Sequence, residues 1–220
     1  MLRQPAPLIA VAVLQICQIP LYGALGKASR ISDKHVAACH IEQFGVGNAV
    51  QEIADLAHVA IGVESVFDPE TEPKIKIHFR GGRLANLLNR LVSQAPEYQW
   101  REDDGIIHVL WHGAHLPLAD VVMSYPGVHD KTVGEIWDDL AARPELKAWL
   151  HSNHCSRQEA LSITGPTRTT PHARISIEAG SITLARLLDQ AAIKSGENFW
   201  QIAQSAPGKP CVVSIWLPWV

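Results

Sequence analysis

One stretch of this chain is written twice, one hundred positions apart. The segment "IKIHFRGGRLANLLNRL" (75–91) aligns without a gap with "ISIEAGSITLARLLDQA" (175–191), and apolar residues fall at the same places in both. The match continues downstream, where Trp100 recurs as Trp200. An internal repeat constrains architecture more than any short motif does. We therefore predict two related modules.

The repeat also sets the expected boundaries. We place the first module at residues 38–112, a linker at 113–118 ("HGAHLP", with its flanks) and the second module at 119–220. Upstream of the aligned stretch, "VQEIADLA" resembles "VGEIWDDLA". After this point the second copy carries an insertion at about 142–172, which the first copy lacks.

Each module is predicted to be α+β, with two helices packed on a mixed sheet that ends in a C-terminal hairpin (β-α-β-β-α-β-β). "KIKIHF" alternates apolar and polar residues, as a half-buried strand does. Leucines recur at helical spacing from Leu84 to Leu91, and "DDG" supplies turn chemistry before "IIHVLW". In the second copy, "ALSITG" (160–165) and "ARISIE" are expected to be strands.

Helix starts are marked by capping patterns. Asn48 is followed by Gln51, which predicts that Asn48 caps the first helix. Thr132 and Glu135 form the same kind of box in the second copy. Pro144 is typical of the first position of a helix and predicts a helical segment in the insertion.

The N-terminus, residues 1–28, has the composition of a secretory signal peptide. Arg3 precedes an apolar run, and Ala24 or Ala28 offers a small residue for cleavage. A retained membrane anchor is the alternative, and Cys17 raises the option of a lipoprotein, although Ile16 replaces the small residue that lipidation needs. We favour cleavage, and hence a periplasmic or secreted protein that would contact a membrane only through an uncleaved segment.

Three cysteines remain after this segment, and at most one intramolecular disulfide can form. Cys155–Cys211 is the first choice because both residues belong to the second module, whereas a bridge from Cys39 would cross between modules. A Cys39 bridge, or three reduced thiols, stays open, since pairing requires Cα atoms within about 7 Å.

Several function classes lack their signals. The formal net charge is -3 and basic residues are not clustered, which argues against nucleic-acid binding. No nucleophile elbow, HExxH or phosphate-binding loop occurs, so we predict neither an enzyme nor a cofactor. An enzyme with its site between the modules is retained as a third hypothesis.

Histidines supply the only metal candidates, and tryptophans the only contact candidates. His108, His112 and His115 lie close together in sequence, but His108 belongs to the predicted strand "IIHVLW", and exposed linker histidines are the simpler interpretation of the other two. The insertion contains a second group of candidate metal ligands, His151, His154 and Cys155. Trp100 and Trp200 are expected in the core, and Trp216 and Trp219 are possible contacts. The acidic "DPETEP" is expected to be a solvated turn.

The pattern of these segments resembles the secretin and TonB short N-terminal domain. "AVQEIADLAHVAIGVESVF", "IKIHFRGGRLANLLNRLVSQAPEYQW" and "GIIHVLW" carry the resemblance over about residues 41–111, and the second copy follows from Arg174 onward. The resemblance implies a small periplasmic module that contacts protein partners. No barrel or secretin pore sequence follows the modules.

Two functions from different classes follow. The first is an exported, non-enzymatic protein–protein interaction or scaffold protein of the bacterial envelope, which would recognise an envelope or periplasmic partner through sheet edges or a helical face. In this reading the insertion supplies partner specificity. The second is a periplasmic metal-binding or sensing protein that uses the histidine-rich segments.

Overall fold

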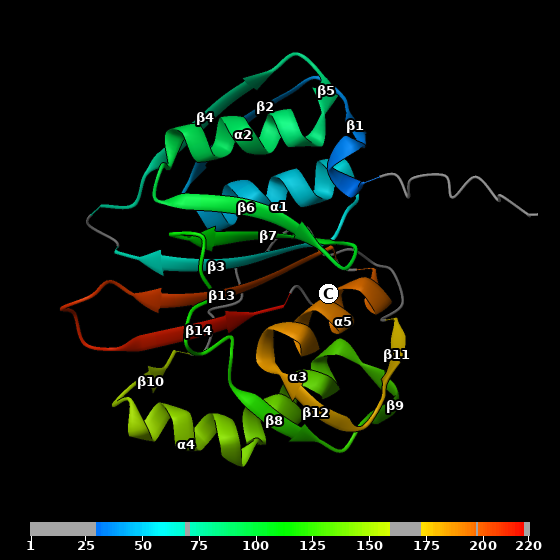
Figure 1. The fold of residues 1–220 in the computed structure, drawn as a ribbon, viewed down its shortest axis with the longest axis vertical. Helices are drawn as coiled ribbons and strands as arrows, with labels where there is room; N and C mark the ends of the chain where they lie inside the picture. Colours follow the sequence, from blue (N-terminus) through cyan, green and yellow to red (C-terminus); the bar gives the residue numbers. More distant parts are fainter. Residues whose placement is uncertain (1–29, 69–70, 159–172, 197, 218–220) are drawn as a thin grey trace, which may run out of the picture.

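The computed structural model describes residues 30–68, 71–158, 173–196 and 198–217 (Figure 1). The predicted signal segment, the predicted strand at 160–165 and Trp219 lie outside the described residues. The fold is α+β, as predicted, with parallel and antiparallel strands in one mixed sheet. Within the described ranges, no helix is both long and apolar enough to span a bilayer.

The first half of the described chain begins with a short 3-10 helix and alternates strands with two α-helices. Its elements are η1 Ile31–Asp33, β1 His35–Val36, β2 Cys39–Phe44, α1 Val46–Ala57, β3 Ile61–Phe67, β4 Lys74–Phe79, β5 Gly82–Arg83, α2 Leu84–Gln94, β6 Tyr98–Asp103 and β7 Ile106–Trp111. The predicted hairpin is β6–β7, and the predicted half-buried strand is β4.

The second half repeats this order and adds one helix. Its elements are β8 Val122–Tyr125, β9 Val128–Thr132, α3 Val133–Ala142, α4 Pro144–Ser152, β10 Ser156–Arg157, β11 Arg174–Ile177, β12 Gly180–Thr183, α5 Leu184–Ser195, β13 Phe199–Ser205 and β14 Val212–Trp216. The pairings repeat as well: β2 pairs with β4 as β9 pairs with β11, and β1 pairs with β5 as β8 pairs with β12. α4 is the added helix, and Pro144 begins it as predicted.

Both halves contribute to one central sheet, in the order β10-β14-β13-β3-β7-β6. The sequence does not predict this continuity, because it suggests a separate sheet for each module. The two halves join where β13 pairs in parallel with β3 along its whole length, from Phe199–Ile61 to Ser205–Phe67. β3 is therefore a central strand, with β13 on one side and β7, also parallel, on the other.

The halves use opposite faces of this sheet. The lateral order β3-β7-β6 is repeated as β10-β14-β13, but β14 runs opposite to β7, since β13 is parallel to β3 and antiparallel to β14. Repeating an order while reversing the strands exchanges the faces. Ile61, Val63 and Phe199 accordingly belong to the core under α1 and α2, whereas Trp200 and Ile202 belong to the core under α3 and α5 (Figure 1).

The helices pack through the apolar stripes that the sequence predicts. Leu88 on α2 and Leu188 on α5 are both fully buried. The box of Thr132 and Glu135 caps α3 as predicted, with both reciprocal hydrogen bonds present. The predicted cap at Asn48 is wrong: α1 already begins at Val46, and the Asn48 side chain donates to the Phe44 carbonyl from inside the first turn.

A disulfide fastens the inserted segment to the sheet. Cys155 follows α4, and its sulfur is bonded to Cys211, which directly precedes β14; the two Cα atoms are 4.5 Å apart. This is the pair that the sequence ranks first. β10 then pairs in parallel with β14 from Ser156–Val212. Cys39 is a free, half-buried thiol on β2.

Candidate functional site

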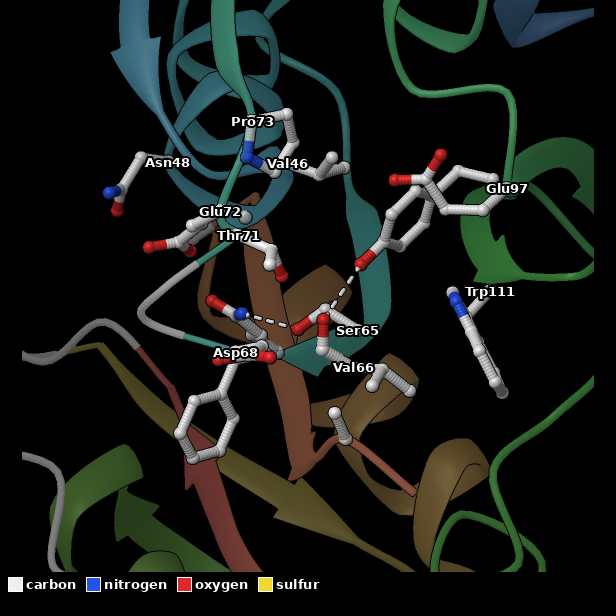
Figure 2. A pocket seen from close by; sticks show the side chains of 15 residues that line it. Val46, Asn48, Ser65, Val66, Asp68, Thr71, Glu72, Pro73, Glu97 and Trp111 are labelled. Atoms are coloured by element: carbon white, nitrogen blue, oxygen red, sulfur yellow. Dashed lines mark hydrogen bonds between the residues drawn. The ribbon is translucent and has the colours of Figure 1, made fainter. Parts of the chain in front are cut away.

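A cleft lies at the carboxyl ends of the three parallel strands, β3, β7 and β13. It is lined by the last residues of β3, by Trp111 at the end of β7, by Gln201 and Ala206 from β13 and its end, and by the first turn of α1 (Figure 2). Its volume is about 210 Å³. The ends of parallel strands are a preferred place for binding, because several chain segments diverge there and leave a hollow. We call it the strand-end cleft.

Two glycines let α1 approach this cleft closely. A Cβ at Gly47 would lie 2.5 Å from the amide end of the Gln201 side chain, so a larger residue there would displace Gln201 from its place in the cleft. Gly45 has φ +79° and lies against the Glu72 side chain. Glu72 thereby places its negative charge at the N-terminus of α1, where the helix dipole favours it.

Acidic side chains surround the opening. Glu72 and Glu97 stand on opposite sides of it, and Asp68 lies at the end of β3 (Figure 2). The Tyr98 hydroxyl lies between these segments and donates to the Val66 carbonyl at 3.3 Å. Burial, with smaller contributions from the charges of Glu97 and Glu72, raises the pKa of Tyr98 to about 12. The acidic side chains thus give the rim of the cleft a negative charge.

A second group of polar side chains is buried between the halves, under α5. Glu64, in the middle of β3, is fully buried. One carboxylate oxygen lies 2.5 Å from His115 Nδ1, and the other accepts the Leu116 backbone N–H at 2.5 Å. The other nitrogen of His115, Nε2, contacts Arg101 on β6. Burial raises the pKa of Glu64, and the hydrogen bonds from His115 and Leu116 oppose that rise.

The same face holds a histidine–aspartate pair. His108 Nε2 on β7 lies 3.7 Å from Asp189 Oδ2 on α5, and Asp189 Oδ1 accepts the indole N–H of Trp200 at 2.9 Å. Burial lowers the pKa of His108 to about 4 and raises that of Asp189 to about 6. Both shifts favour the uncharged forms, so we take the contact as a polar one between desolvated groups and not as a strong ion pair. We call Glu64, His115, His108 and Asp189 the buried polar cluster.

The predicted metal candidates are not brought together. The rings of His108 and His115 are 6.0 Å apart, centre to centre, and His112, His151 and His154 are exposed elsewhere. Cys155 is in the disulfide and offers no thiolate. In the part of the chain that the structure describes, no three His, Cys, Asp or Glu side chains are grouped closely enough to hold a metal ion.

His108 lies on β7, the predicted strand, and is 4% exposed because α5 of the second half covers it. One residue prediction needs correction. Trp100 is only half-buried, whereas Trp200 is fully buried as predicted. Trp216 is half-buried and packs its ring against Phe199, with ring centres 5.2 Å apart, so the described part of the C-terminus does not present it as a free contact.

Sequence reasoning missed the two carboxylates of the buried polar cluster. Glu64 interrupts the apolar run of "IGVESVF", and a charged residue inside such a run is a usable signal of a buried polar contact. Asp189 could have been found by comparing the copies, since Asn89 stands one hundred positions earlier.

Searches of protein-family models and of curated proteins return no match to this chain.

Proposed function

We propose that the protein is an exported, non-enzymatic recognition protein of the bacterial envelope, which binds a partner protein by taking one of its cationic side chains into the strand-end cleft. The observation that carries this proposal is the combination of small volume and negative rim. A cavity of about 210 Å³ lies below the usual range of about 300–1,000 Å³ for small-molecule sites. It is large enough for the end of a lysine or arginine side chain.

The internal hydrogen bonds of the cleft support a preformed recognition surface. Gln201 donates to the Ser65 hydroxyl at 2.8 Å, and Tyr98 donates to the Val66 carbonyl. These groups hold β3, β6 and β13 in place around the opening, so a partner would meet a rigid surface. Rigid sites lose little entropy on binding.

Recognition by strand addition has less support than the cleft. The outer edge of β4 is covered at Lys76, whose backbone N–H and C=O are both bonded to the Gln94 side-chain amide, at 2.8 and 2.6 Å. β6, at the edge of the central sheet, carries Arg101, Glu102 and Asp103, and charged residues discourage pairing with another strand. The resemblance to secretin and TonB N-terminal modules supports an envelope partner.

Site-specific photo-crosslinking in the exporting bacterium tests this function. A crosslinking side chain at Thr71, exposed at the rim of the cleft, should capture one partner protein, and the same side chain at Asn86, exposed on α2, should not. Replacing Glu72 and Glu97 by glutamine should abolish capture at Thr71, because the cationic group loses its counter-charges.

The purified protein provides the second arm of the test. A lysine-containing peptide from the captured protein should shift the amide NMR signals of the cleft, and the same peptide with that lysine acetylated should not. Equal capture at Thr71 and Asn86, or equal binding of both peptides, would contradict recognition of a cation by the cleft.

A further inference from the structure

Two histidines face one another on the exposed surface of the β2–β4 pair. His40 and His78 are directly opposite in the register. Their Nδ1 atoms are 3.1 Å apart and their ring centres 4.2 Å apart. Both side chains are exposed. Neither belongs to the histidine-rich segments that the sequence singles out.

The separation of the two nitrogens is that of two ligands on one metal ion. A metal–nitrogen bond of about 2.0–2.1 Å places two ligands about 3.3 Å apart in a tetrahedral site and about 2.9 Å apart at adjacent corners of a square one. The observed 3.1 Å lies between these values. We propose that His40 and His78 form a two-histidine site for a late divalent transition metal, with Cu²⁺ the strongest binder by the usual order of affinities.

The strands hold the two rings in this position before any metal arrives. Ile41 and Ile77, the next residues along each strand, are opposite each other and fully buried, which fixes the backbone on both sides. The carbonyl oxygen of His78 also accepts a hydrogen bond from Arg90 at 2.8 Å. A metal would replace the single proton that neutral rings can share between their Nδ1 atoms, without a change of backbone.

A carboxylate stands behind one of the ligands. Glu42 Oε2 lies 3.6 Å from His40 Nε2, the nitrogen that would not bind the metal. Histidine ligands commonly direct their second N–H to a carboxylate, which fixes the tautomer and strengthens the ligand. Lys74 and Lys76 bind the other oxygen of Glu42, at 2.7 and 3.1 Å, and their positive charges oppose a bound cation. Water, or a group from another protein, would complete the coordination.

This site is independent of the proposed recognition function. It lies on β2 and β4, and none of its members lines the strand-end cleft. Either inference can therefore fail without the other. The site needs only two protein ligands, so it is compatible with the absence of any group of three potential ligands among the described residues.

Cu²⁺ titration of the untagged full-length protein tests the site. Calorimetry with glycine as a competing chelator should show one binding step. His40→Ala and His78→Ala should each weaken the affinity by about tenfold or more, since even the loss of a residue that only supports a metal ligand typically costs about 10–100-fold. Electron paramagnetic resonance of the loaded protein should show two nitrogen ligands, and one after either substitution.

A matched control separates this site from general binding by surface histidines. His129 is an exposed histidine on β9, the strand that corresponds to β2 in the second half, and its Nδ1 contacts the Ser176 hydroxyl at 2.9 Å. His129→Ala should leave the binding step intact. Unchanged binding in His40→Ala, or an equal loss in His129→Ala while circular dichroism shows all variants folded, overturns the proposal.

Discussion

The two halves each have a tryptophan at the same repeat position, but its surroundings differ. In the first half, Trp100 donates its indole N–H to Asn89 at 2.8 Å near the surface. One hundred positions later, Trp200 donates to Asp189 at 2.9 Å in the interior. The hydrogen bond is conserved between the halves in geometry, but its acceptor is neutral and exposed in one case, and ionisable and 3% exposed in the other.

The place of each strand in the sheet explains the difference. Trp100 lies on β6, which is the edge strand of the central sheet, and Trp200 lies on β13, which is a central strand because it also pairs with β3. Trp200 packs over Gly62 of β3, where a Cβ would lie 2.3 Å from the indole ring. A repeated sequence therefore does not give a repeated environment when the copies join through one edge only.

The largest difference between the halves is expected on removal of the two tryptophans. Trp200→Ala should lower the free energy of unfolding by about 3–5 kcal/mol, because it opens a cavity under α5 and removes the donor to Asp189. Trp100→Ala should cost at most about 2 kcal/mol, since the ring is only half-buried. Urea denaturation of both variants measures the difference.

The leucines provide the control for that comparison. Leu88 and Leu188 are equally buried at matching positions of α2 and α5, so replacing either with alanine should cost a similar amount, about 2–5 kcal/mol. Similar losses for both tryptophan variants, or very different losses for the two leucine variants, would contradict the view that strand position sets the difference.

The disulfide gives the second half a constraint that the first half lacks. Replacing Cys155 and Cys211 together with alanine should cost about 2–4 kcal/mol, because the unfolded chain regains the freedom of the closed loop. Cys39→Ala in the first half should change the free energy of unfolding much less, since its thiol is free and half-buried. Thermal unfolding compares these variants, and non-reducing peptide mapping must show the linked peptides in the parent. Three alkylatable thiols there would refute the bridge.

The smallest effect is expected when the acceptors of the two indole hydrogen bonds, Asp189 and Asn89, are exchanged. The pKa of Asp189 is raised from 3.8 to about 6, so its ionised form destabilises the fold above about pH 6, and this cost disappears as the pH falls from 6 to 3.8. Asp189→Asn keeps an acceptor for Trp200 and should stabilise the protein by about 1–3 kcal/mol at pH 7, with no gain near pH 4. Asn89→Asp, at the exposed position, should change stability by less than about 0.5 kcal/mol.

Measuring parent and variant at each pH removes the contributions that both share. The pKa of His108 is lowered to about 4, so His108 makes the fold lose stability as the pH falls from 6.5 to 4. Because His108 lies 3.7 Å from Asp189, the difference between the two stability curves reports Asp189 together with its contact to His108. A difference that does not change between pH 4 and 7 would show that the carboxyl group carries no such penalty.

Local patterns in the sequence were sufficient for several of the helices and strands. Alternation gave β4, leucine spacing gave α2 and α5, the Thr132–Glu135 box gave the start of α3, and Pro144 gave that of α4. These features depend on neighbours within a few residues, and the repeat shows them twice. The start of α1 was misplaced because the same short-range pattern is ambiguous. Asn48 resembles a cap, but it lies inside the first turn of a helix whose N-cap is Gly45.

Only the tertiary structure decided where the polar positions of the strands would lie. Glu64 and His108 alternate with core residues along β3 and β7, so within one module their side of the sheet would face water. The second half reverses the direction of the repeated strands and thereby covers that side with α5. Pairing of β2 with β4 inside the first half places His40 opposite His78, and the acidic residues of the strand-end cleft also come together from separate segments of that half. Sequence periodicity specifies two faces for each strand, but which face meets solvent depends on what the rest of the chain packs against it.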